Sequence, residues 1–215
     1  METTYQLHGH QLEQVKNAKY LGVELSNNLS WTDHIKATSK KANRTSAFVY
    51  RNLKGCSTKI QNHCYKTLVR PIMEYASPIW DPSESTHSDL LESVQRRSAR
   101  RILHDFDPRS SVTSMLQKLE LPTLKERRKI DKVAMMYRIQ DNQININTDH
   151  VLKRPPRATR GQANKYFVPQ SRSNTHLHSF FPSGIRLWNS LPSHAYSAQT
   201  LPCFKATLGE WAKSQ

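Results

Sequence analysis

The sequence has few cysteines and lacks any long apolar run. Three cysteines, Cys56, Cys64 and Cys203, occur in 215 residues, so at least one has no partner within the chain. A small, odd number of cysteines is typical of proteins that stay in a reducing compartment. No apolar run approaches the roughly 20 residues that a membrane helix needs, and residues 1–6 lack the features of a signal peptide. We therefore expect an intracellular chain, in the nucleus or cytoplasm, with no membrane partner.

Acidic residues are also scarce. The net charge is +15, and from His150 to Gly209 there is not one acidic residue. The eight aspartates are scattered, and no two are adjacent. This charge favours a polyanionic partner, nucleic acid before an anionic membrane surface. A basic surface that is merely solvated would have the same composition, because charge alone does not name a ligand.

Motifs of common active sites are missing. The sequence contains no Gly-x-Ser-x-Gly, no phosphate-binding P-loop and no Gly-x-Gly-x-x-Gly. Two His-x-His pairs, at residues 8–10 and 176–178, could each hold a metal from one side of a strand, but neither has a nearby third ligand. Cys56, His63 and Cys64 do not have the spacing of a zinc knuckle. We therefore expect no metal and no cofactor.

The first 30 residues favour β structure. Short segments on either side of Gly9 predict a hairpin. Large residues alternate at Leu21, Val23 and Leu25, which predicts one strand over 19–25 that ends in the turn residues 26–28. A further strand is expected at 166–168.

A helix is expected over 30–52. Ser30 and Asp33 fit a capping pattern at its start, and Gly55 fits its end. Ile35, Ala42, Val49 and Leu53 mark the face expected to pack. The basic residues expected on the other faces are Lys36, Lys40, Lys41, Arg44 and Arg51.

A second helix is expected to start at Ser57 and to enter the stretch 68–81, Leu-Val-Arg-Pro-Ile-Met-Glu-Tyr-Ala-Ser-Pro-Ile-Trp-Asp. Ile60, Cys64, Leu68 and Ile72 lie four residues apart, which predicts one buried stripe. Pro71 predicts a bend, and Pro78 predicts an extended turn that ends at Trp80. Tyr75 and Trp80 are expected to be buried where this stretch joins its neighbours.

The third expected helix, over 88–104, has two separate faces. At about 100° per residue, the packing residues fall within an arc of about 80° and the arginines within another of about 140°. The packing residues are Leu91, Val94, Ser98 and Ile102. The arginines are Arg96, Arg97, Arg100 and Arg101. Guanidinium groups match phosphate, so this face could bind a nucleic-acid backbone or could simply be solvated.

The second half is expected to be helical around an irregular basic segment. Short helices are expected over 111–119 and after Thr200, and a longer one, capped by Thr123 and Glu126, up to 140. In the longer helix Ile130, Val133, Ala134 and Tyr137 are expected to face inward, and Lys125, Arg127, Arg128, Lys129 and Lys132 mostly outward. Residues 150–172 form a basic arm that carries Arg154, Arg157 and Arg160. An aromatic cluster that includes Trp188 follows, and Phe204, Leu208 and Trp211 mark the buried face of the last helix.

Five stretches, in order, resemble one family. Residues 68–81 resemble the thumb signature of reverse transcriptases from non-LTR (LINE-type, jockey-like) retrotransposons, and Tyr20-Leu21-Gly22-Val23 resembles their primer grip. Residues 111–116, 121–128 and 181–192 resemble the C-terminal part of the same enzymes. The resemblance covers about residues 5–212.

The resemblance implies a mainly α chain in three parts. These are a palm-edge β segment at 1–30, a three-helix thumb-like bundle at 31–106 and a helical C-terminal extension at 107–215. Pro71, Tyr75, Trp80, Trp188 and Trp211 are the expected structural residues. Tyr20, Leu21 and Gly22 are the primer-grip-like residues, and the nucleic-acid-binding residues are expected to be Lys36, Lys40, Lys41, Arg44, Arg96, Arg97, Arg100, Arg101, Arg154, Arg157 and Arg160.

The family's catalytic aspartates precede the Tyr-Leu-Gly motif, and this sequence has no Asp-Asp pair. We therefore expect no polymerase activity. Mg²⁺, which belongs to the full-length enzyme, is not expected here, and the expected partner is an RNA or DNA duplex or hybrid, bound with weak sequence preference. Two alternatives stay open. The sequence could be a truncated gene model of an active reverse transcriptase, which an in-frame Ala-Asp-Asp upstream of Met1 would reveal, or a fossil reading frame without function.

Overall fold

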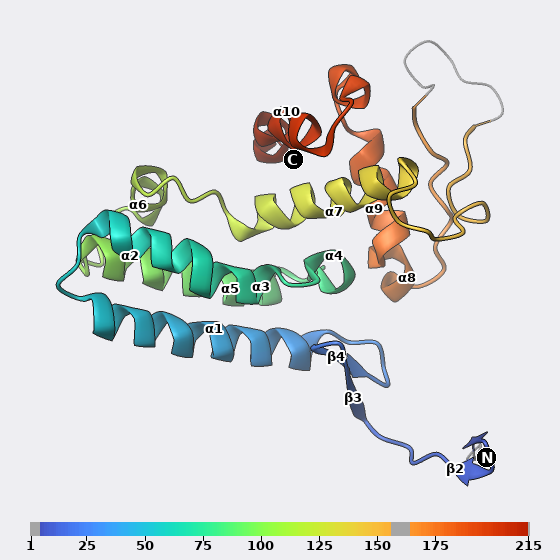
Figure 1. The fold of residues 1–215 in the computed structure, drawn as a ribbon, viewed down its shortest axis with the longest axis horizontal. Coiled ribbons are helices and arrows are strands. Elements are labelled where there is room, and N and C mark those ends of the chain that lie inside the picture. Colours follow the sequence, from blue (N-terminus) through green and yellow to red (C-terminus); the bar gives the residue numbers. More distant parts are fainter. Residues whose placement is uncertain (1–4, 156–163, 215) are drawn as a thin grey trace.

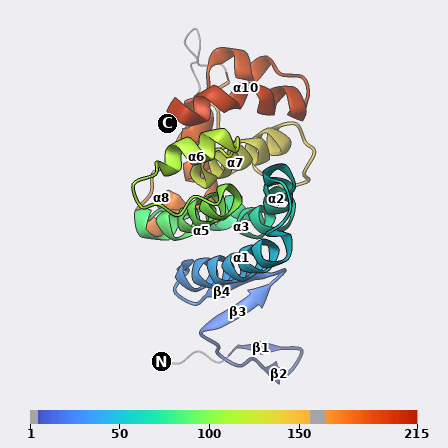
Figure 2. The same ribbon diagram turned by 90° about the vertical axis from the view of Figure 1, so that its left-hand side faces the viewer.

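The structure, a computed structural model that describes residues 5–155 and 164–214, is mainly helical with two small antiparallel hairpins near the N-terminus, as predicted. Figure 1 shows the helices in layers, with α1 at one edge and α10 at the other. Figure 2, turned by 90°, shows the hairpins beyond α1. No helix in the part of the chain that the structure describes is long and apolar enough to cross a bilayer.

Both hairpins turn on two residues with positive φ. Strands β1 (Gln6–Leu7) and β2 (His10–Gln11) are joined by His8 and Gly9, at φ 48° and 80°. Strands β3 (Asn17–Tyr20) and β4 (Val23–Ser26) are joined by Leu21 and Gly22, at 45° and 84°. Such turns match the twist of paired strands. The predicted hairpin at Gly9 is confirmed. The prediction of one strand over 19–25 is wrong, because Leu21 and Gly22 reverse the chain.

Helix α1 (Thr32–Leu53) buries the face that the sequence predicted. Ile35, Ala42 and Val49 are buried. The predicted capping pattern forms only in part: the N-cap residue is Trp31, whose side chain does not cap, but Ser30 Oγ accepts a hydrogen bond from the Thr32 N–H at 3.3 Å. The Asp33 carboxylate instead accepts a hydrogen bond from Asn17 Nδ2 of β3 at 3.0 Å, which ties the hairpin to the helix. The C-cap residue is Lys54, in a right-handed conformation, rather than Gly55 as predicted.

The second helix is distorted in its middle. It consists of α2 (Thr58–Cys64), a π-helical turn η1 (Tyr65–Val69) and α3 (Arg70–Glu74), with Pro71 in the first turn of α3. Proline is tolerated in a first turn because its missing N–H would have no partner there. A π turn changes the course of a helix locally, so the irregularity predicted at Pro71 is present just before it.

The predicted buried stripe on this helix is wrong by one residue. Ile60 and Leu68 are exposed. The buried residues are Gln61, Tyr65, Val69 and Met73. The buried polar groups among these are satisfied: the Tyr65 hydroxyl donates to Gln95 Oε1 at 2.9 Å, and Gln61 Nε2 donates to the Cys56 carbonyl at 2.9 Å. Apolar periodicity does not predict this stripe, because its first residue, Gln61, is polar.

The link after α3 differs from the extended turn that was predicted. Ala76 adopts a left-handed conformation, and residues Ser77–Trp80 form a single helical turn, α4. Trp80 is fully buried, as predicted, and its indole N–H donates to the Tyr75 carbonyl at 2.8 Å. The predicted burial of Tyr75 is wrong: the side chain is 58% exposed, because its hydroxyl reaches outward to the Leu21 carbonyl of the β3–β4 turn, at 2.8 Å.

The remaining elements follow the predicted order. They are α5 (Ser85–Leu103), α6 (Val112–Lys118), α7 (Leu124–Gln140), α8 (Asn174–His178), α9 (Phe180–Asn189), the 3₁₀ helix η2 (Ser193–Ser197) and α10 (Leu201–Ser214). Thr123 and Glu126 form the predicted capping box on α7. No strand forms at 166–168, where the Phe167 N–H donates to the Lys153 carbonyl at 2.8 Å, so that prediction is wrong.

Two apolar cores meet along α7. The first extends from Val23 to Leu124 and surrounds Trp80; the second extends from Val133 to Ala212 and surrounds Trp188. Phe204, Leu208 and Trp211 are buried in the second core, as predicted for the last helix. The proposed division of the chain at residues 30 and 106 stays a prediction.

Trp80 provides a test of the first core. We expect Trp80→Ala to lower the free energy of unfolding by about 3–5 kcal/mol, because truncation of a buried aromatic side chain loses its burial and leaves a cavity. Ile79→Ala, at the exposed neighbouring position, should change the value by less than about 0.5 kcal/mol. Urea unfolding of the two variants measures the difference, and equal effects would contradict the assignment of Trp80 to the core.

His34 joins the hairpin to this core as a neutral imidazole. Its Nδ1 accepts a hydrogen bond from the Glu24 N–H at 3.2 Å, and its ring lies edge-on to Trp80 with centroids 5.1 Å apart. Burial lowers the pKa of His34 from the ordinary value of 6.5, and the nearby Glu24 carboxylate only partly opposes this. The unfolded chain therefore takes up a proton at this residue at a higher pH than the folded chain does.

It follows that stability should fall as the pH drops from 6.5 toward the lower folded pKa of His34. The slope has an upper limit of about 1.4 kcal/mol per pH unit for one group. We expect this slope, measured by urea unfolding between pH 7 and 5, to be smaller in His34→Gln. His63→Gln, which replaces an exposed histidine, should keep the parent slope. A His34→Gln variant with the parent's pH dependence would refute the assignment.

Candidate nucleic-acid interface

Four of the predicted binding residues lie on the outer face of α1. Lys36, Lys40, Lys41 and Arg44 are all exposed, and so is Arg51 in the last turn of the helix. The buried residues of α1 lie on the opposite face, against α5 and the α2–α3 segment. In Figures 1 and 2 no other helix covers α1 on its far side.

Helix α1 has one acidic residue, and it lies in the first turn. Asp33 is the acidic residue of α1, and its carboxylate is bonded to Asn17. Among the described residues, no carboxylate forms an ion pair with any of the five cations of α1. Within the described part of the chain, the positive charge of the α1 face is therefore not balanced by ion pairs.

The four predicted arginines of α5 have different environments. Arg96 is exposed and pairs with Asp89 at 3.6 Å, while Arg97 is exposed and donates to the Ser93 carbonyl at 3.2 Å. Arg100 donates to the Asp107 carbonyl at 2.7 Å and so holds the loop after α5. The structure therefore separates these arginines into one that is paired, one that holds a loop, and Arg97 and Arg101, which lie one turn apart on α5.

Arg97 and Arg101 extend the α1 face onto α5. Arg101 donates to Ser46 Oγ at 3.2 Å, and its guanidinium carbon lies 5.9 Å from the centroid of the Tyr50 ring. Burial lowers the pKa of Arg101, and repulsion from Arg97 and, more weakly, Arg51 lowers it further. Arg97 and Arg51 each lie near enough to Arg101 to repel it. We call Lys36, Lys40, Lys41, Arg44, Arg51, Arg97 and Arg101 the basic face.

Two small hydroxyls hold α1 and α5 in register beneath the basic face. Ser46 Oγ of α1 and Ser98 Oγ of α5 are buried and 2.8 Å apart, and Ser98 also donates to the Val94 carbonyl at 2.9 Å. Small residues let two helices approach closely. The basic face is thus built on two rigid, directly packed helices.

The other predicted binding residues lie apart from this face. Tyr20, Leu21 and Gly22 form the tip of the β3–β4 hairpin, where Tyr20 and Leu21 are exposed. A Cβ built at Gly22 would lie 3.4 Å from the Tyr75 ring, and its φ of 84° also favours glycine. In the basic arm, Arg154 is exposed and lies 6.0 Å from the centroid of the Tyr166 ring. Arg157 and Arg160 fall outside the described residues.

A buried ion network joins the two cores, and sequence reasoning missed it. Arg128 Nε donates to Asp81 Oδ1 at 2.9 Å, and Lys132 Nζ donates to Asp81 Oδ2 at 2.7 Å. The Arg128 and Lys132 side chains are 1% and 4% exposed. Ser88 of α5 accepts from Arg128, and Ser183 of α9 accepts from Lys132. Asp81 thus connects α4, α5, α7 and α9.

The predicted outward orientation of Arg128 and Lys132 is wrong. Both residues lie four apart on the stripe that starts at the buried Leu124 and ends at the buried Met136. That spacing was the available signal, since positions 124, 128, 132 and 136 share one helix face. The prediction missed this stripe because it assigned Arg128 and Lys132 to the solvated face.

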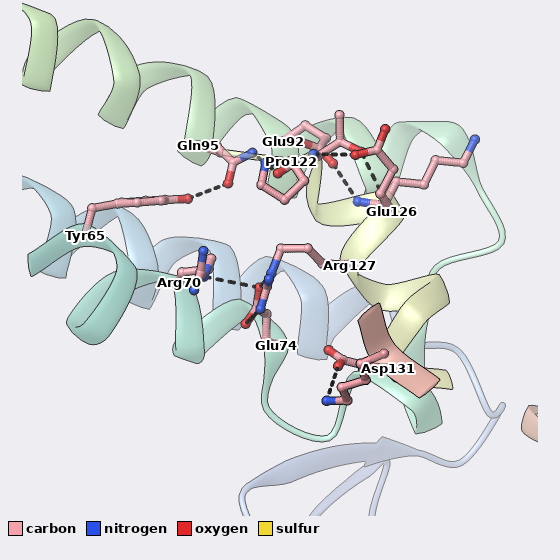
Figure 3. A network of polar contacts seen from close by, with 12 residues as sticks. Tyr65, Arg70, Glu74, Glu92, Gln95, Pro122, Glu126, Arg127 and Asp131 are labelled. Atoms are coloured by element: carbon pink, nitrogen blue, oxygen red, sulfur yellow. Dashed lines mark hydrogen bonds and ion pairs between the residues drawn. The ribbon is translucent and has the colours of Figure 1, made fainter. Parts of the chain in front are cut away.

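A second set of contacts ties α7 to the helices below it (Figure 3). Glu74 of α3 accepts from Arg127 of α7, with Nη2 to Oε2 at 3.0 Å, and lies 3.5 Å from Arg70 Nε. The hydrogen bond to Glu74 raises the pKa of Arg127, whereas burial, followed by repulsion from Arg127, lowers that of Arg70. Arg127 and Arg70 thus both contact Glu74, and none of the three residues belongs to the basic face.

The interface has no evident inner site for a metal. Among residues 5–155 and 164–214, no group of three or more His, Cys, Asp or Glu side chains is placed to hold an ion. Of the predicted histidine pairs, His8 lies in the first hairpin turn, and His176 Nδ1 lies 2.9 Å from Ser171 Oγ.

Comparison with known proteins adds nothing to this geometry: no family model, no curated protein and no solved structure matches the chain.

Asp81 provides a test of the ion network. Asp81→Asn leaves Arg128 and Lys132 buried without a negative charge, so we expect a loss of about 3–5 kcal/mol in the free energy of unfolding. Asp89→Asn removes the same charge at a side chain that is 70% exposed and should cost less than about 1 kcal/mol. Chemical denaturation compares them. A small effect of Asp81→Asn would mean that the two cations reach water in the native state.

Proposed function

We propose that this chain is a non-catalytic, sequence-tolerant nucleic-acid-binding protein, derived from the thumb and C-terminal region of a retrotransposon RNA-directed DNA polymerase. The resemblance of its motifs supports the origin. The observation that carries the binding function is the basic face, where seven cations of two packed helices form no ion pair with a carboxylate in the part of the chain that the structure describes.

The chemistry of the basic face suits a phosphate backbone. Its lysines and arginines are charged at neutral pH, and five of the seven follow the axis of α1 from Lys36 to Arg51. At 1.5 Å per residue this is a span of about 22 Å, comparable to three or four phosphates along one strand. Contacts of this kind position a nucleic acid without reading its sequence.

The absence of an Asp-Asp pair from the sequence supports the non-catalytic part of the proposal. Two carboxylates that share metal ions are what the family's chemistry needs. The expected ligand is the backbone of an RNA or DNA duplex or hybrid, and the basic arm at 150–172 would add to affinity through charge.

Salt dependence tests this proposal. Each neutralised phosphate contributes about −0.9 to the slope of log affinity against log salt for duplex DNA, because counterions are released. Replacing Lys36, Lys40, Lys41 and Arg44 together by Gln should flatten the slope for a random-sequence 25-bp duplex by roughly two to four units.

The matched control removes four exposed cations from other surfaces. Arg109, Lys118, Lys125 and Arg138 are exposed and lie in the loop after α5, on α6 and on α7. Their joint replacement by Gln lowers the net charge by the same amount. Because it removes no cation of the basic face, most of the slope should remain. If the two variants have the same slope, attraction is a property of net charge, and the proposed interface is wrong.

A further inference from the structure

One aromatic side chain lies among the cations of the basic face. Phe48 of α1 is 61% exposed. Arg44 precedes it by one helical turn and Arg51 follows it by less than one turn, so all three side chains are neighbours on the helix surface. Among the residues of α1, Phe48 is the exposed large hydrophobic one.

Phe48 does not belong to the packing face of α1. At about 100° per residue, it lies roughly 120° from the middle of the arc that contains Ile35, Ala42 and Val49. The rest of its surroundings is polar: Thr45 lies one turn before it, and Asn52 Nδ2 donates to the Phe48 carbonyl at 2.8 Å. The fold therefore gives no internal reason for a phenyl ring here.

We propose that Phe48 is a base-stacking residue, so that the basic face takes nucleic acid with unpaired bases: a single strand or the unpaired end of a duplex. The inference rests on the proposed function. Cations spaced along α1 hold successive phosphates, and an aromatic ring between them meets the bases that those phosphates carry. In a duplex the flat faces of the bases are hidden within the stack, whereas in a single strand they are open to a protein ring.

A comparable phenylalanine provides the internal control. Phe106, in the loop after α5, is 58% exposed, but its neighbours in the chain are Asp105 and Asp107 rather than cations. The two carboxylates beside this ring would repel phosphate. Any general effect of removing an exposed phenyl ring should therefore be equal at both positions, and a stacking effect should occur only at Phe48.

The probes are two 20-mers of equal charge: oligo(dT), and an abasic chain that keeps the sugar–phosphate backbone without bases. We expect Phe48→Ala and Phe48→Leu to weaken binding to oligo(dT) by about tenfold, within the range for one stacked base. Phe48→Tyr, which keeps an aromatic face, should bind as the parent does. All variants should bind the abasic chain equally, and Phe106→Ala should match the parent on both probes. Circular dichroism confirms that each variant folds.

Three results would overturn the inference. One is an unchanged affinity of Phe48→Ala for oligo(dT), and another is an equal loss on the abasic chain. The third is an equal loss on a 20-residue polyglutamate, which would make the face a site for an acidic protein. Failure of the parent to bind the random-sequence 25-bp duplex in 50 mM salt would instead reject the proposed function itself.

Discussion

The carboxylate of Asp81 is the contact on which the arrangement of the two cores depends. Two cations of α7 would be buried without compensation if it were absent, and a buried unpaired charge is among the most costly defects in a folded protein. Asp81 follows directly after Trp80, the largest side chain of the first core, while Lys132 also bonds to Ser183 at the edge of the second core. The position of Trp80 therefore determines where the ion network forms, and the network in turn orients α7.

The same arrangement leaves α1 free to be basic. Cations of α7 are used inside the molecule, where Asp81 and Glu74 neutralise them. Those of α1 point away from the core and meet no carboxylate among the described residues. The net charge of +15 thus includes two groups of cations, one used in internal ion pairs and one exposed on α1. Which group a lysine belongs to follows from the face of the helix on which it lies.

Several features could be read from the sequence because they depend on local rules. The capping box at Thr123 and Glu126, the packing face of α5 and the burial of Trp80 and Trp188 all follow from spacing and side-chain type. The errors occur where a distant partner decides the outcome. Gln61 is buried because a backbone carbonyl satisfies it, Arg128 because Asp81 does, and Tyr75 is exposed because its hydroxyl reaches a hairpin turn. The chemistry of the candidate interface was foreseeable, but its division between α1 and α5 required the packing of Ser46 against Ser98.

The continuity of α7 makes the two cores mechanically inseparable. Its first residue, Leu124, belongs to one core, and Val133, Met136 and Tyr137 belong to the other, with no loop between them. A fragment that ended after α7 would leave the apolar side chains of its last turns in water, and a fragment that began there would lack the carboxylate for Lys132. Neither half can be shortened at this helix without an exposed, aggregation-prone surface. The two cores should therefore unfold together.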